Sequence, residues 1–552
     1  MDWIPTRLSY RQTGYFSKII TDYLDQADAL TSFYAHPVSL KGICASLEDR
    51  QRSPVNRQVL VTALKKQYEG VAVAPLVQQN IDRLADGNTF TVCTAHQPAI
   101  FTGSLYFIYK ILHTIKLAAH LSTELPQYRF VPVFYMGSED ADLEELGKIW
   151  LDQEKLVWDT KQTGAVGRMK PAGLEKIMHR IEGEFSVQPF GGELGSMLRE
   201  AYLESPDIQT GTFRLIHRLF AEYGLVVLIP DEAGLKRLMI SVFEDDLFRQ
   251  TPSRLVDDTI QRLSRHYKVQ ANPRAINLFY LKDDLRGRIE KSGDKFVVHD
   301  SRLVFGEEEM RKELQQYPER FSPNVILRGL FQEMILPNLA FIGGGGETAY
   351  WLEFKDLFAH YNVSFPVLIL RNSFLLLEEQ WNEKLENAGV TVTKIFTPEE
   401  ELINELVRRQ SQQRLNLEQE ITEATLFYEK LKKLSGSVDP TLSQHVEALQ
   451  AKALAPLKDL EKKLLKAEKR KFNDQRRQIH TIQSALFPLN GLQERIDNFL
   501  PWYAKRGRKF IGDLYAQSLS LEQEFVILAE TKHGDEQPRS GAGVAAINTQ
   551  PL

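Results

Sequence analysis

Cysteine is almost absent from this chain. Only Cys44 and Cys93 occur among 552 residues, they lie far apart, and no CxxC pattern is present. This scarcity argues against a disulfide framework and against a cysteine-based zinc site. Two isolated thiols fit a reducing compartment, so we expect a cytoplasmic protein.

Long apolar runs and a basic charge excess are also missing. No uninterrupted run of about 18 apolar residues occurs, and the first residues, "MDWIPTRLSYRQTGYF", lack the apolar stretch of a secretory signal. We therefore expect no membrane partner. A net charge of −5 gives no basic footprint, so we expect no nucleic-acid partner. The apolar fraction of 43% is ample for a packed core.

Several familiar catalytic motifs do not occur either. The histidines form no HxxxH or HExxH pair, so no metal site is predicted. A nucleophilic serine of the GxSxG type is absent. The run of four glycines at 343–346 is followed by neither the Lys-Ser/Thr of a phosphate loop nor the spacing of GxGxxG.

What is present is the alternation of strands and helices that builds a parallel sheet. Short β-branched and aromatic runs at 89–95, 129–137, 224–231 and 365–373 are separated by helical patterns. We therefore predict an α/β fold with a Rossmann-like parallel-sheet core. In such sheets ligands bind where loops leave the carboxyl ends of the strands.

The pattern also predicts how the chain divides. We expect an N-terminal helical segment packed on a core that two insertions interrupt, then a coiled-coil hairpin, a helical segment and a disordered tail. In order, the predicted parts are 1–86 helical, 87–150 core, 151–210 insertion, 211–250 core, 251–322 insertion with β-hairpins, 323–395 core, 396–490 coiled-coil hairpin, 491–531 helical and 532–552 tail.

The predicted hairpin is rich in charged and long aliphatic residues. Apolar residues recur at steps of three and four, as at Leu417, Ile421, Ala424, Tyr428, Leu431 and Leu434. Gly436 and Pro440 then break the pattern between two helices. A helix of about 37 residues in this hairpin would be about 55 Å long. An exposed apolar seam predicts a homodimer. The basic run near 462–477 is more typical of a solvated helix face than of an RNA contact.

The first candidate site is the loop "HQPAIFTGS", between the first core strand and a helix. Backbone N–H groups at such a junction can face an anion, and several side chains add donors. The residues concerned are His96, Gln97, Thr102, Gly103, Tyr106 and Lys110. The alternative is an ordinary strand–helix loop with a satisfied histidine.

The second candidate is the acidic turn "SEDADLEEL" after the next strand. Glu139 and Asp140 could bind Mg²⁺, accept from an amine or act as a base. The simpler interpretation is a set of acids at a helix N-terminus, where the helix dipole favours them.

The third candidate is "NLAFIGGGGETAYWLEF", with charged residues shortly before it. Glycines there would let a ligand lie against bare backbone, although a flexible loop is the alternative. The residues concerned are Arg328, Gln332, Glu333, Gly343, Gly344, Gly345, Gly346, Glu347, Tyr350 and Trp351. We expect Glu347, Tyr350 and Trp351 to form the side walls of the site.

The fourth candidate follows the strand "FPVLIL". Arg371 could hold a phosphate or carboxylate through both ends of its guanidinium, with Asn372 and Ser373 beside it. Alternatively, Asn372 or Ser373 caps a following helix. The two interpretations can coexist.

Taken together, these stretches resemble a known family, the cysteine-adding enzymes of bacillithiol biosynthesis. The resemblance extends from about residue 10 to 525 and is carried by "HQPAIFTGSLYFIYKI", "VPVFYMGSEDADLEEL", "GAVGRM", "YGLVVLIPD", "INLFYL", "SPNVILRGLFQEMILPNLAFIGGGGETAYWLEFK", "FPVLILRNS" and "FPLNGLQERIDNF". The chain departs from the family pattern at Ala141 and Ser104, where many members carry histidine and proline.

The resemblance implies a core similar to class I aminoacyl-tRNA synthetases, with connecting-peptide insertions. It also implies a ligase that joins L-cysteine to glucosaminyl-malate. By analogy with the synthetases, ATP would activate the cysteine as an adenylate, and Mg²⁺ could accompany the ATP. Glu139, Asp140 and Arg371 would then be catalytic. No KMSKS-type signature follows Arg371, so the ATP step rests on analogy. The alternatives are another ATP-dependent ligase or nucleotidyl transferase on this fold, or a non-catalytic nucleotide-binding scaffold.

Overall fold

A computed structural model describes residues 3–411 and 416–531 of the chain. The predicted tail, 532–552, lies outside the described residues. The chain divides into two units: one holds Met1–Thr6, Leu376–Leu486 and Ile527–Leu552, and the other holds Arg7–Leu375 and Phe487–Val526. Among the residues that the structure describes, no helix is both long enough and apolar enough to cross a bilayer.

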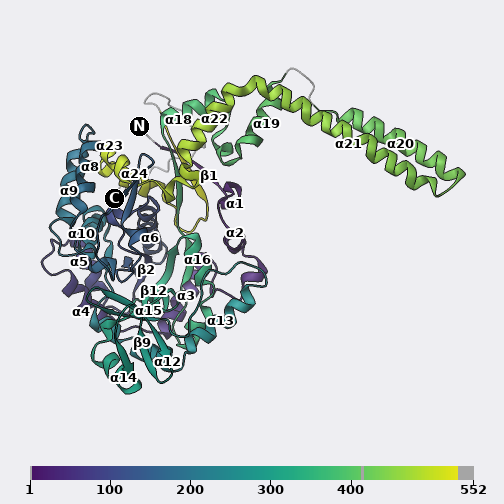
Figure 1. The fold of residues 1–552 in the computed structure, drawn as a ribbon. Helices are drawn as coiled ribbons and strands as arrows, with labels where there is room; N and C mark the ends of the chain where they lie inside the picture. Colours follow the sequence, from purple (N-terminus) through teal and green to yellow (C-terminus); the bar gives the residue numbers. More distant parts are fainter. Residues whose placement is uncertain (1–2, 412–415, 532–552) are drawn as a thin grey trace, which may run out of the picture. The chain divides into compact units, whose positions relative to one another are not determined.

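A five-stranded parallel sheet lies at the centre of the larger unit (Figure 1). Its strands, in spatial order, are β13 (Val367–Leu370), β12 (Asn338–Gly343), β2 (Thr89–His96), β3 (Arg129–Met136) and β6 (Val226–Leu228). Every neighbouring pair runs parallel. In chain order this is 5-4-1-2-3, the doubly wound arrangement whose order reverses between β2 and β12. The predicted Rossmann-like core is confirmed.

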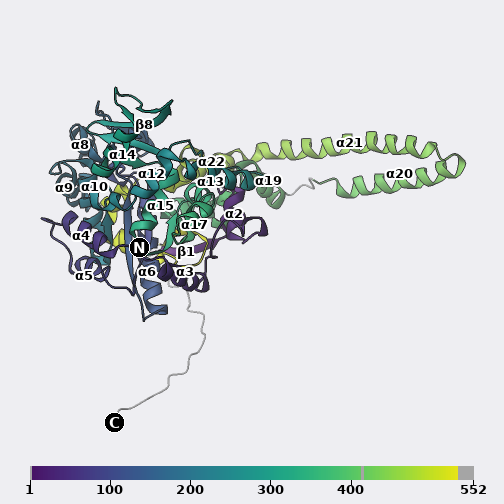
Figure 2. The same cartoon turned by 90° about the horizontal axis from the view of Figure 1, so that it is seen from below.

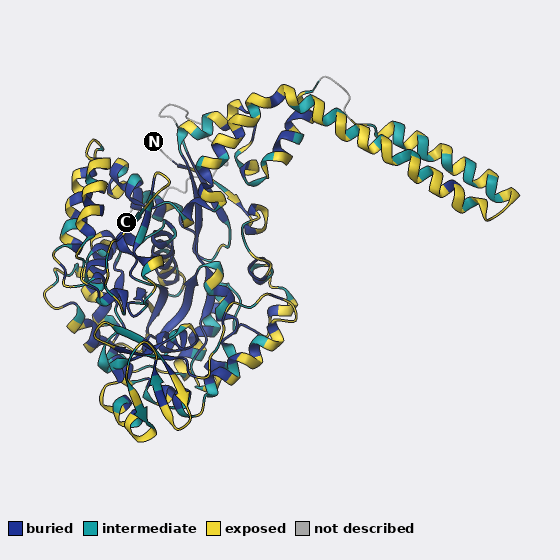
Figure 3. Cartoon of the chain, viewed as in Figure 1, coloured by how far each residue is buried: buried dark blue, intermediate teal, exposed yellow. Residues whose placement is uncertain are grey.

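The strands are apolar because helices cover the sheet. Helix α6 (Tyr106–Glu124) packs on β2 and β3, and α3 (Leu40–Arg52) packs on β12 and β13. Side chains of both helices and of the strands, among them Leu117 and Ile342, form one buried cluster. The central strands are dark blue, the colour of buried residues, in Figure 3. Strands buried in this way read as continuous apolar runs, which is why their sequences were recognisable.

The first insertion contains a hairpin and three helices. Strands β4 (Lys148–Leu151) and β5 (Glu154–Val157) pair antiparallel. The helices that follow are α8 (Leu174–Phe185), α9 (Gly191–Tyr202) and α10 (Ile208–Phe220).

The second insertion is built around the predicted hairpin, which the structure extends to five antiparallel strands. The order is β10 (Val304–Gly306), β9 (Lys295–Val298), β8 (Leu285–Ser292), β7 (Leu278–Lys282) and β11 (Phe321–Pro323). Strand β11 follows helix α14 (Glu307–Gln316) in the chain, so it pairs with β7 although the two strands are far apart in the sequence.

Two details of the local structure differ from the predictions. The N-terminal part is not wholly helical, because it begins with β1 (Trp3–Leu8), which forms a three-stranded sheet with β15 (Phe525–Glu530) and β14 (Ser373–Leu377). Ser373 therefore starts a buried strand and caps no helix. The five residues of this strand, Ser373–Leu377, are too few for a helical or strand period to show in the sequence.

The smaller unit contains the predicted helical hairpin. Helices α20 (Glu418–Val438) and α21 (Leu442–Lys469) lie side by side in Figures 1 and 2. The turn between them is fixed by Asp439, whose carboxylate accepts from the Thr441 N–H at 2.9 Å. The longer of the two, α21, has 28 residues and so falls short of a helix of about 37, because a 3₁₀ turn at Arg470–Phe472 separates it from α22 (Asn473–Leu486). At 1.5 Å per residue it is about 42 Å long.

Candidate active site

A cavity of about 500 Å³ opens at the carboxyl ends of the parallel strands. Its walls include the loops that follow β2, β3, β6, β12 and β13, so it lies where the strand order reverses. This is the position at which doubly wound sheets bind ligands. Twelve of the residues that the sequence singled out line it: His96, Gln97, Tyr106, Glu139, Asp140, Arg328, Gly344, Gly345, Gly346, Glu347, Tyr350 and Arg371.

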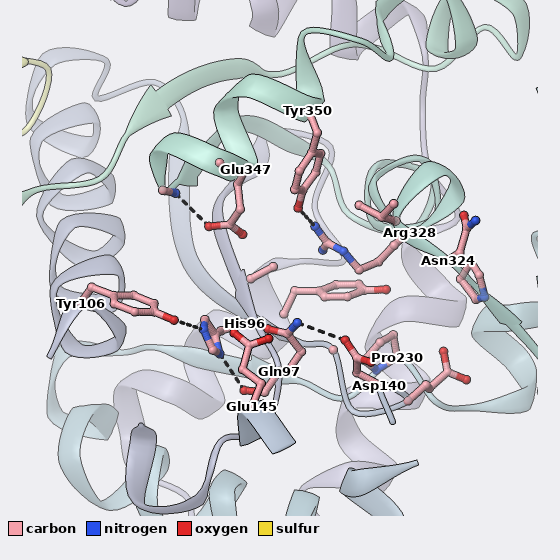
Figure 4. A pocket seen from close by; sticks show the side chains of 18 of the residues that line it. His96, Gln97, Tyr106, Asp140, Glu145, Pro230, Asn324, Arg328, Glu347 and Tyr350 are labelled. Carbon is pink, nitrogen blue, oxygen red and sulfur yellow. Dashed lines mark hydrogen bonds between the residues drawn. The ribbon is translucent and has the colours of Figure 1, made fainter. Parts of the chain in front are cut away.

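His96, the last residue of β2, is held between two oxygen atoms (Figure 4). Its Nδ1 lies 2.9 Å from the Gln97 carbonyl oxygen, and its Nε2 lies 2.9 Å from the Tyr106 hydroxyl. A carbonyl can only accept, so Nδ1 carries the proton and Nε2 accepts from Tyr106. Burial, assisted by the nearby Lys110 cation, lowers the pKa of His96 to about 4. The imidazole is therefore neutral at pH 7.

Lys110 and Glu347 form an ion pair at the cavity wall, in which the lysine is buried and the glutamate lines the cavity. The Lys110 ammonium donates to Glu347 at 2.6 Å and to the Ala95 carbonyl at 2.5 Å. The same Glu347 oxygen accepts from the Gly344 N–H at 2.8 Å. Burial opposes the ionisation of Glu347, but Lys110 and the Gly344 N–H outweigh it and hold its pKa below the usual value. Lys110 thus supports the glycine-rich wall from below and does not line the cavity.

Asp140 is oriented from two sides. Its carboxylate accepts from the Gln97 amide at 3.1 Å, as Figure 4 shows, and from the Ala141 N–H at 2.7 Å. Arg286, from the second insertion, lies 3.9 Å from the same carboxylate and stacks over the Phe279 ring. An acidic and a basic side chain therefore meet at this wall.

Glu139 belongs to a buried charge network. Lys236 donates to Glu139 and, at 2.9 Å, to the Phe321 carbonyl oxygen. Asp231 lies 3.9 Å from Lys236 and accepts from Arg168 Nε and Nη2, each at 2.7 Å. Burial, the largest influence, raises the pKa of Glu139 despite the neighbouring Lys236. Of the two carboxylates in the network, Glu139 is the one that lines the cavity.

Arg328 projects from α15 (Val325–Ile335) into the cavity wall (Figure 4). Its Nη2 donates to the Tyr350 hydroxyl at 2.9 Å. Its Nη1 is buried and has no hydrogen-bond partner among the described residues. A buried charged donor without an acceptor is costly, and such groups frequently mark a site for a ligand or an ion.

Arg371 is also part of the wall, but its fork is already occupied. Both Nη atoms donate to Glu494, at 2.7 and 2.9 Å, and Nη1 also bonds Ser373 at 3.1 Å. The predicted bidentate grip on a substrate anion is therefore wrong. Only Nε, which has no partner among the described residues, is left for a ligand.

The remaining predicted residues lie outside this cavity. Trp351 is fully buried and stacks on Phe341, with ring centroids 4.5 Å apart, so it is part of the core and not a side wall. Glu333 pairs with Arg50 inside the protein. The others are distributed as follows: Gln332 bonds Glu333, Thr102 is buried, Gly103 lines a neighbouring hollow, Gly343 ends β12, Asn372 bonds His113 and Ser373 bonds Arg371.

The four glycines do not form a flexible loop. None of them has a positive φ, and Gly345 and Gly346 begin α16 (Gly345–Trp351). A side chain at Gly344 would lie 3.6 Å from Arg371 Nε, at the cavity edge. Gly344, Gly345 and Gly346 present bare backbone to the cavity, while Gly343 packs against Phe341.

Sequence reasoning assigned no role to several lining residues. They are Glu145, Pro230, Arg286, Asn324 and Arg495. Arg286 comes from the second insertion and Arg495 from a segment about 120 residues beyond the last core strand. The motif "FPLNGLQERIDNF" contains Arg495, but nothing in its spacing shows that it returns to the sheet.

A parallel α/β domain with a polar cavity at its switch point, followed by a helical hairpin, defines the class as a Rossmann-like protein with a coiled-coil domain. Residues 5–372 match the family described as "Bacillithiol biosynthesis BshC, N-terminal Rossmann-like domain", and residues 374–530 match its "C-terminal coiled-coil domain". The chain belongs to the BshC family of bacillithiol biosynthesis.

Relatives match along nearly the whole chain. One from Flavobacterium johnsoniae, named "Putative cysteine ligase BshC", is 39% identical over 94% of this chain and 99% of its own. One of the same name from Cytophaga hutchinsonii is 40% identical over 89% and 92%. Among solved structures, a Campylobacter jejuni protein described as a "putative arginyl t-RNA synthetase" matches with 9% identity over 81% and 98%. Its TM-score of 0.23 is too low to support an argument.

Proposed function

We propose that this protein is a cytoplasmic carbon–nitrogen ligase that joins the carboxyl group of L-cysteine to the amine of glucosaminyl-malate, the last step of bacillithiol biosynthesis. Family membership and the name of the relatives support the reaction type. The observation that carries it is the cavity itself. Carboxylate and guanidinium side chains both line it. The two substrates together carry ammonium and carboxylate groups, which need partners of these two kinds.

The carboxylates suit the amine. An ammonium must lose a proton before its nitrogen can attack a carbonyl, so a nearby base is needed. Glu139 lines the cavity, and burial raises its pKa, which makes it a better proton acceptor than an exposed glutamate. Asp140, fixed by Gln97 and the Ala141 N–H, can orient the ammonium. We assign the base to Glu139 and the orienting role to Asp140.

The cationic side suits anionic oxygens. Arg328 Nη1 and Arg371 Nε are two buried donors at the same cavity that lack an acceptor among the described residues. Charged N–H groups bind carboxylate and phosphate oxygens strongly. They can therefore receive the malate carboxylates of the acceptor or the phosphates of a nucleotide.

Amide formation from a free carboxylate needs a leaving group, and we propose that ATP supplies it as AMP. The cysteine carboxylate would attack the α-phosphate and release pyrophosphate, and the amine would then displace AMP. The residues present fit the phosphates through the two unpaired arginine donors and the bare backbone of Gly344 to Gly346. In the described part of the chain no group of three His, Cys, Asp or Glu side chains could hold a metal ion. Any Mg²⁺ would therefore arrive with the nucleotide.

We also propose that the hairpin mediates a homodimer. Large apolar side chains on α20 and α21 remain exposed. Figure 3 colours many residues of both helices as exposed or intermediate. The exposed apolar side chains are Leu426, Phe427, Leu434, Val438, Leu442, Leu449 and Leu460. An apolar stripe of this kind on paired helices is commonly covered by another helix pair.

The test is to incubate the purified protein with labelled cysteine, ATP and glucosaminyl-malate. We expect a labelled amide that forms only when all three are present. Transfer of the label to a different amine would favour another ligase. Binding of nucleotide with no product from any amine would favour a scaffold. In cells, loss of the gene should remove the thiol from the mass spectrum of small thiols.

A further inference from the structure

A segment far along the chain, residues 493–498, completes the site. The Asn498 amide donates to the Phe101 carbonyl at 3.0 Å, and the Ser104 hydroxyl donates to the Arg495 carbonyl at 2.9 Å. Both bonds fasten the segment to the loop that follows β2. The Arg495 side chain lines the cavity and also the neighbouring hollow of about 480 Å³. Residues 493–498 therefore form part of the cavity wall.

Glu494 is the buried carboxylate of this segment. It is fully buried and accepts from both Nη atoms of Arg371, at 2.7 and 2.9 Å, and from the Ser373 hydroxyl at 3.2 Å. The Arg371 guanidinium lies over the Tyr106 ring, 5.0 Å from its centroid. With one edge held by Glu494 and one face by Tyr106, the guanidinium has a single orientation.

That orientation turns Nε toward the glycine-rich wall. A Cβ at Gly344 would lie 3.6 Å from Nε and 3.5 Å from a Glu347 oxygen. Both Arg371 and Gly344 line the cavity. Nε has no acceptor among the described residues, although the other two nitrogens are fully engaged.

A second buried arginine shows what a purely structural pair looks like. Arg50 pairs with Glu333 away from the cavity, and each of its three nitrogens has an acceptor. Nε donates to the Asn338 carbonyl at 3.1 Å, Nη1 to the Glu333 carbonyl at 3.0 Å and Nη2 to the Glu333 carboxylate at 2.9 Å. Arg371 differs in keeping one charged donor unsatisfied, and that donor belongs to a cavity-lining side chain.

We propose that Glu494 is a positioning residue, which holds the Arg371 fork so that Nε–H can donate to an anionic oxygen of a substrate. This inference rests on the proposed function for the identity of the substrate. The oxygen is a carboxylate or a phosphate, and both present the same lone pairs to the donor. Glu494 itself touches no substrate and acts through Arg371.

The test compares ligand binding by the full-length protein and four variants: Glu494→Gln, Glu494→Asp, Arg371→Lys and the double variant Arg371→Lys/Glu494→Gln. Titration calorimetry measures the affinity for ATP, L-cysteine, glucosaminyl-malate, L-malate and pyrophosphate separately. Thermal melting measures stability. The control is Glu313→Gln, which breaks an Arg320–Glu313 pair that does not line the cavity.

We expect Glu494→Gln to weaken one class of anion about tenfold, either the phosphates or the malate carboxylates, and to change the others less than about twofold. Glu494→Asp, which keeps the charge, should recover part of the loss. The double variant should bind no more weakly than Arg371→Lys, because Glu494 has nothing to position once the fork is gone. Glu313→Gln should change melting only.

Two results would overturn the inference. One is a Glu494→Gln protein that melts earlier but binds all five ligands as wild type does. The other is a wild-type protein that binds no anion of the set. Binding of malate or pyrophosphate without any cysteine amide would instead count against the proposed function and leave the role of Glu494 standing.

Discussion

Among single residues, Arg328 contributes most to the cationic side of the cavity. It enters from α15, and its Nη1 has no acceptor in the described chain. Leaving such a group buried and unpaired costs about 1–3 kcal/mol, which a bound anion would recover. The unpaired Nη1 of Arg328 therefore favours the binding of an anion in this cavity.

Replacing Arg328 with alanine should lower kcat/KM for ligation by about 10- to 100-fold, since a hydrogen bond to a charged group contributes about 1.5–3 kcal/mol. Steady-state kinetics with each substrate varied in turn would measure the loss. Arg288→Ala is the matched control, because Arg288 also has a buried Nε without a partner in the described chain but does not line the cavity. Equal losses in the two variants would remove Arg328 from the site.

His96 should contribute no ionisation to the pH profile near neutrality. Its pKa is lowered from 6.5 to about 4, so it is already neutral at pH 6 and stays neutral as the pH rises. We expect kcat/KM of wild type and His96→Asn to differ in size but to have the same shape from pH 6 to 8. A change in kcat/KM near pH 6.5 that wild type shows and His96→Asn lacks would contradict a neutral His96.

Residues close to strand ends could be predicted from the sequence, and their distant partners could not. His96 ends β2 and Asp140 lies shortly after β3, and the carboxyl ends of parallel strands meet at one edge. Lys236 and Glu494 reach the site through contacts that span 97 and 123 positions, and no local pattern shows these. Trp351 was misplaced because neighbours on a helix point about 100° apart: Tyr350 lines the cavity and Trp351 enters the core.

At the scale of elements, α16 shows that the glycine run has two different functions. Gly346 is in the first turn of the helix, and a Cβ there would meet nothing within 4 Å. Gly343 ends β12, and a Cβ there would approach Phe341 to 2.9 Å and Glu347 to 3.1 Å. One glycine leaves open space at the cavity, and the other allows close packing.

Alanine substitutions should separate these functions. Gly346→Ala should stabilise the protein by up to about 1 kcal/mol, because alanine is the better helix former. Gly343→Ala should destabilise it by about 1–3 kcal/mol through overpacking. Urea unfolding would measure both. Loss of stability in both variants, or in neither, would contradict the assignment.

At the scale of the molecule, the parallel sheet was easier to predict from the sequence than the three-stranded sheet and the end of the hairpin. The five parallel strands are buried along nearly their whole length because helices cover them, and their β-branched and apolar pattern is local. The sheet of β1, β15 and β14 joins segments from near both ends of the chain, so its pairing depends on tertiary structure alone. The hairpin was recognisable from its period, but the end of α21 was not, because the helical pattern continues through the 3₁₀ turn.

The proposed dimer can be tested on the exposed seam of the hairpin. Leu434 and Val438 are 66% and 78% exposed on α20, and glutamate at both positions should repel a partner helix. We expect light scattering to show a dimer for wild type and a monomer for Leu434→Glu/Val438→Glu. Val187→Glu makes the same change at a site 87% exposed elsewhere and should leave the dimer intact. A wild-type monomer would refute the proposal.

The most direct test of the central claim is to follow the two carboxylate oxygens of ¹⁸O-labelled L-cysteine during the reaction with ATP and glucosaminyl-malate. An adenylate formed in the switch-point cavity predicts, by mass spectrometry, an amide that keeps one ¹⁸O and AMP that gains the other. Both products should fall together in Arg328→Ala. Absence of the amide, or its formation at an unchanged rate in Arg328→Ala, would contradict the claim that this cavity ligates cysteine.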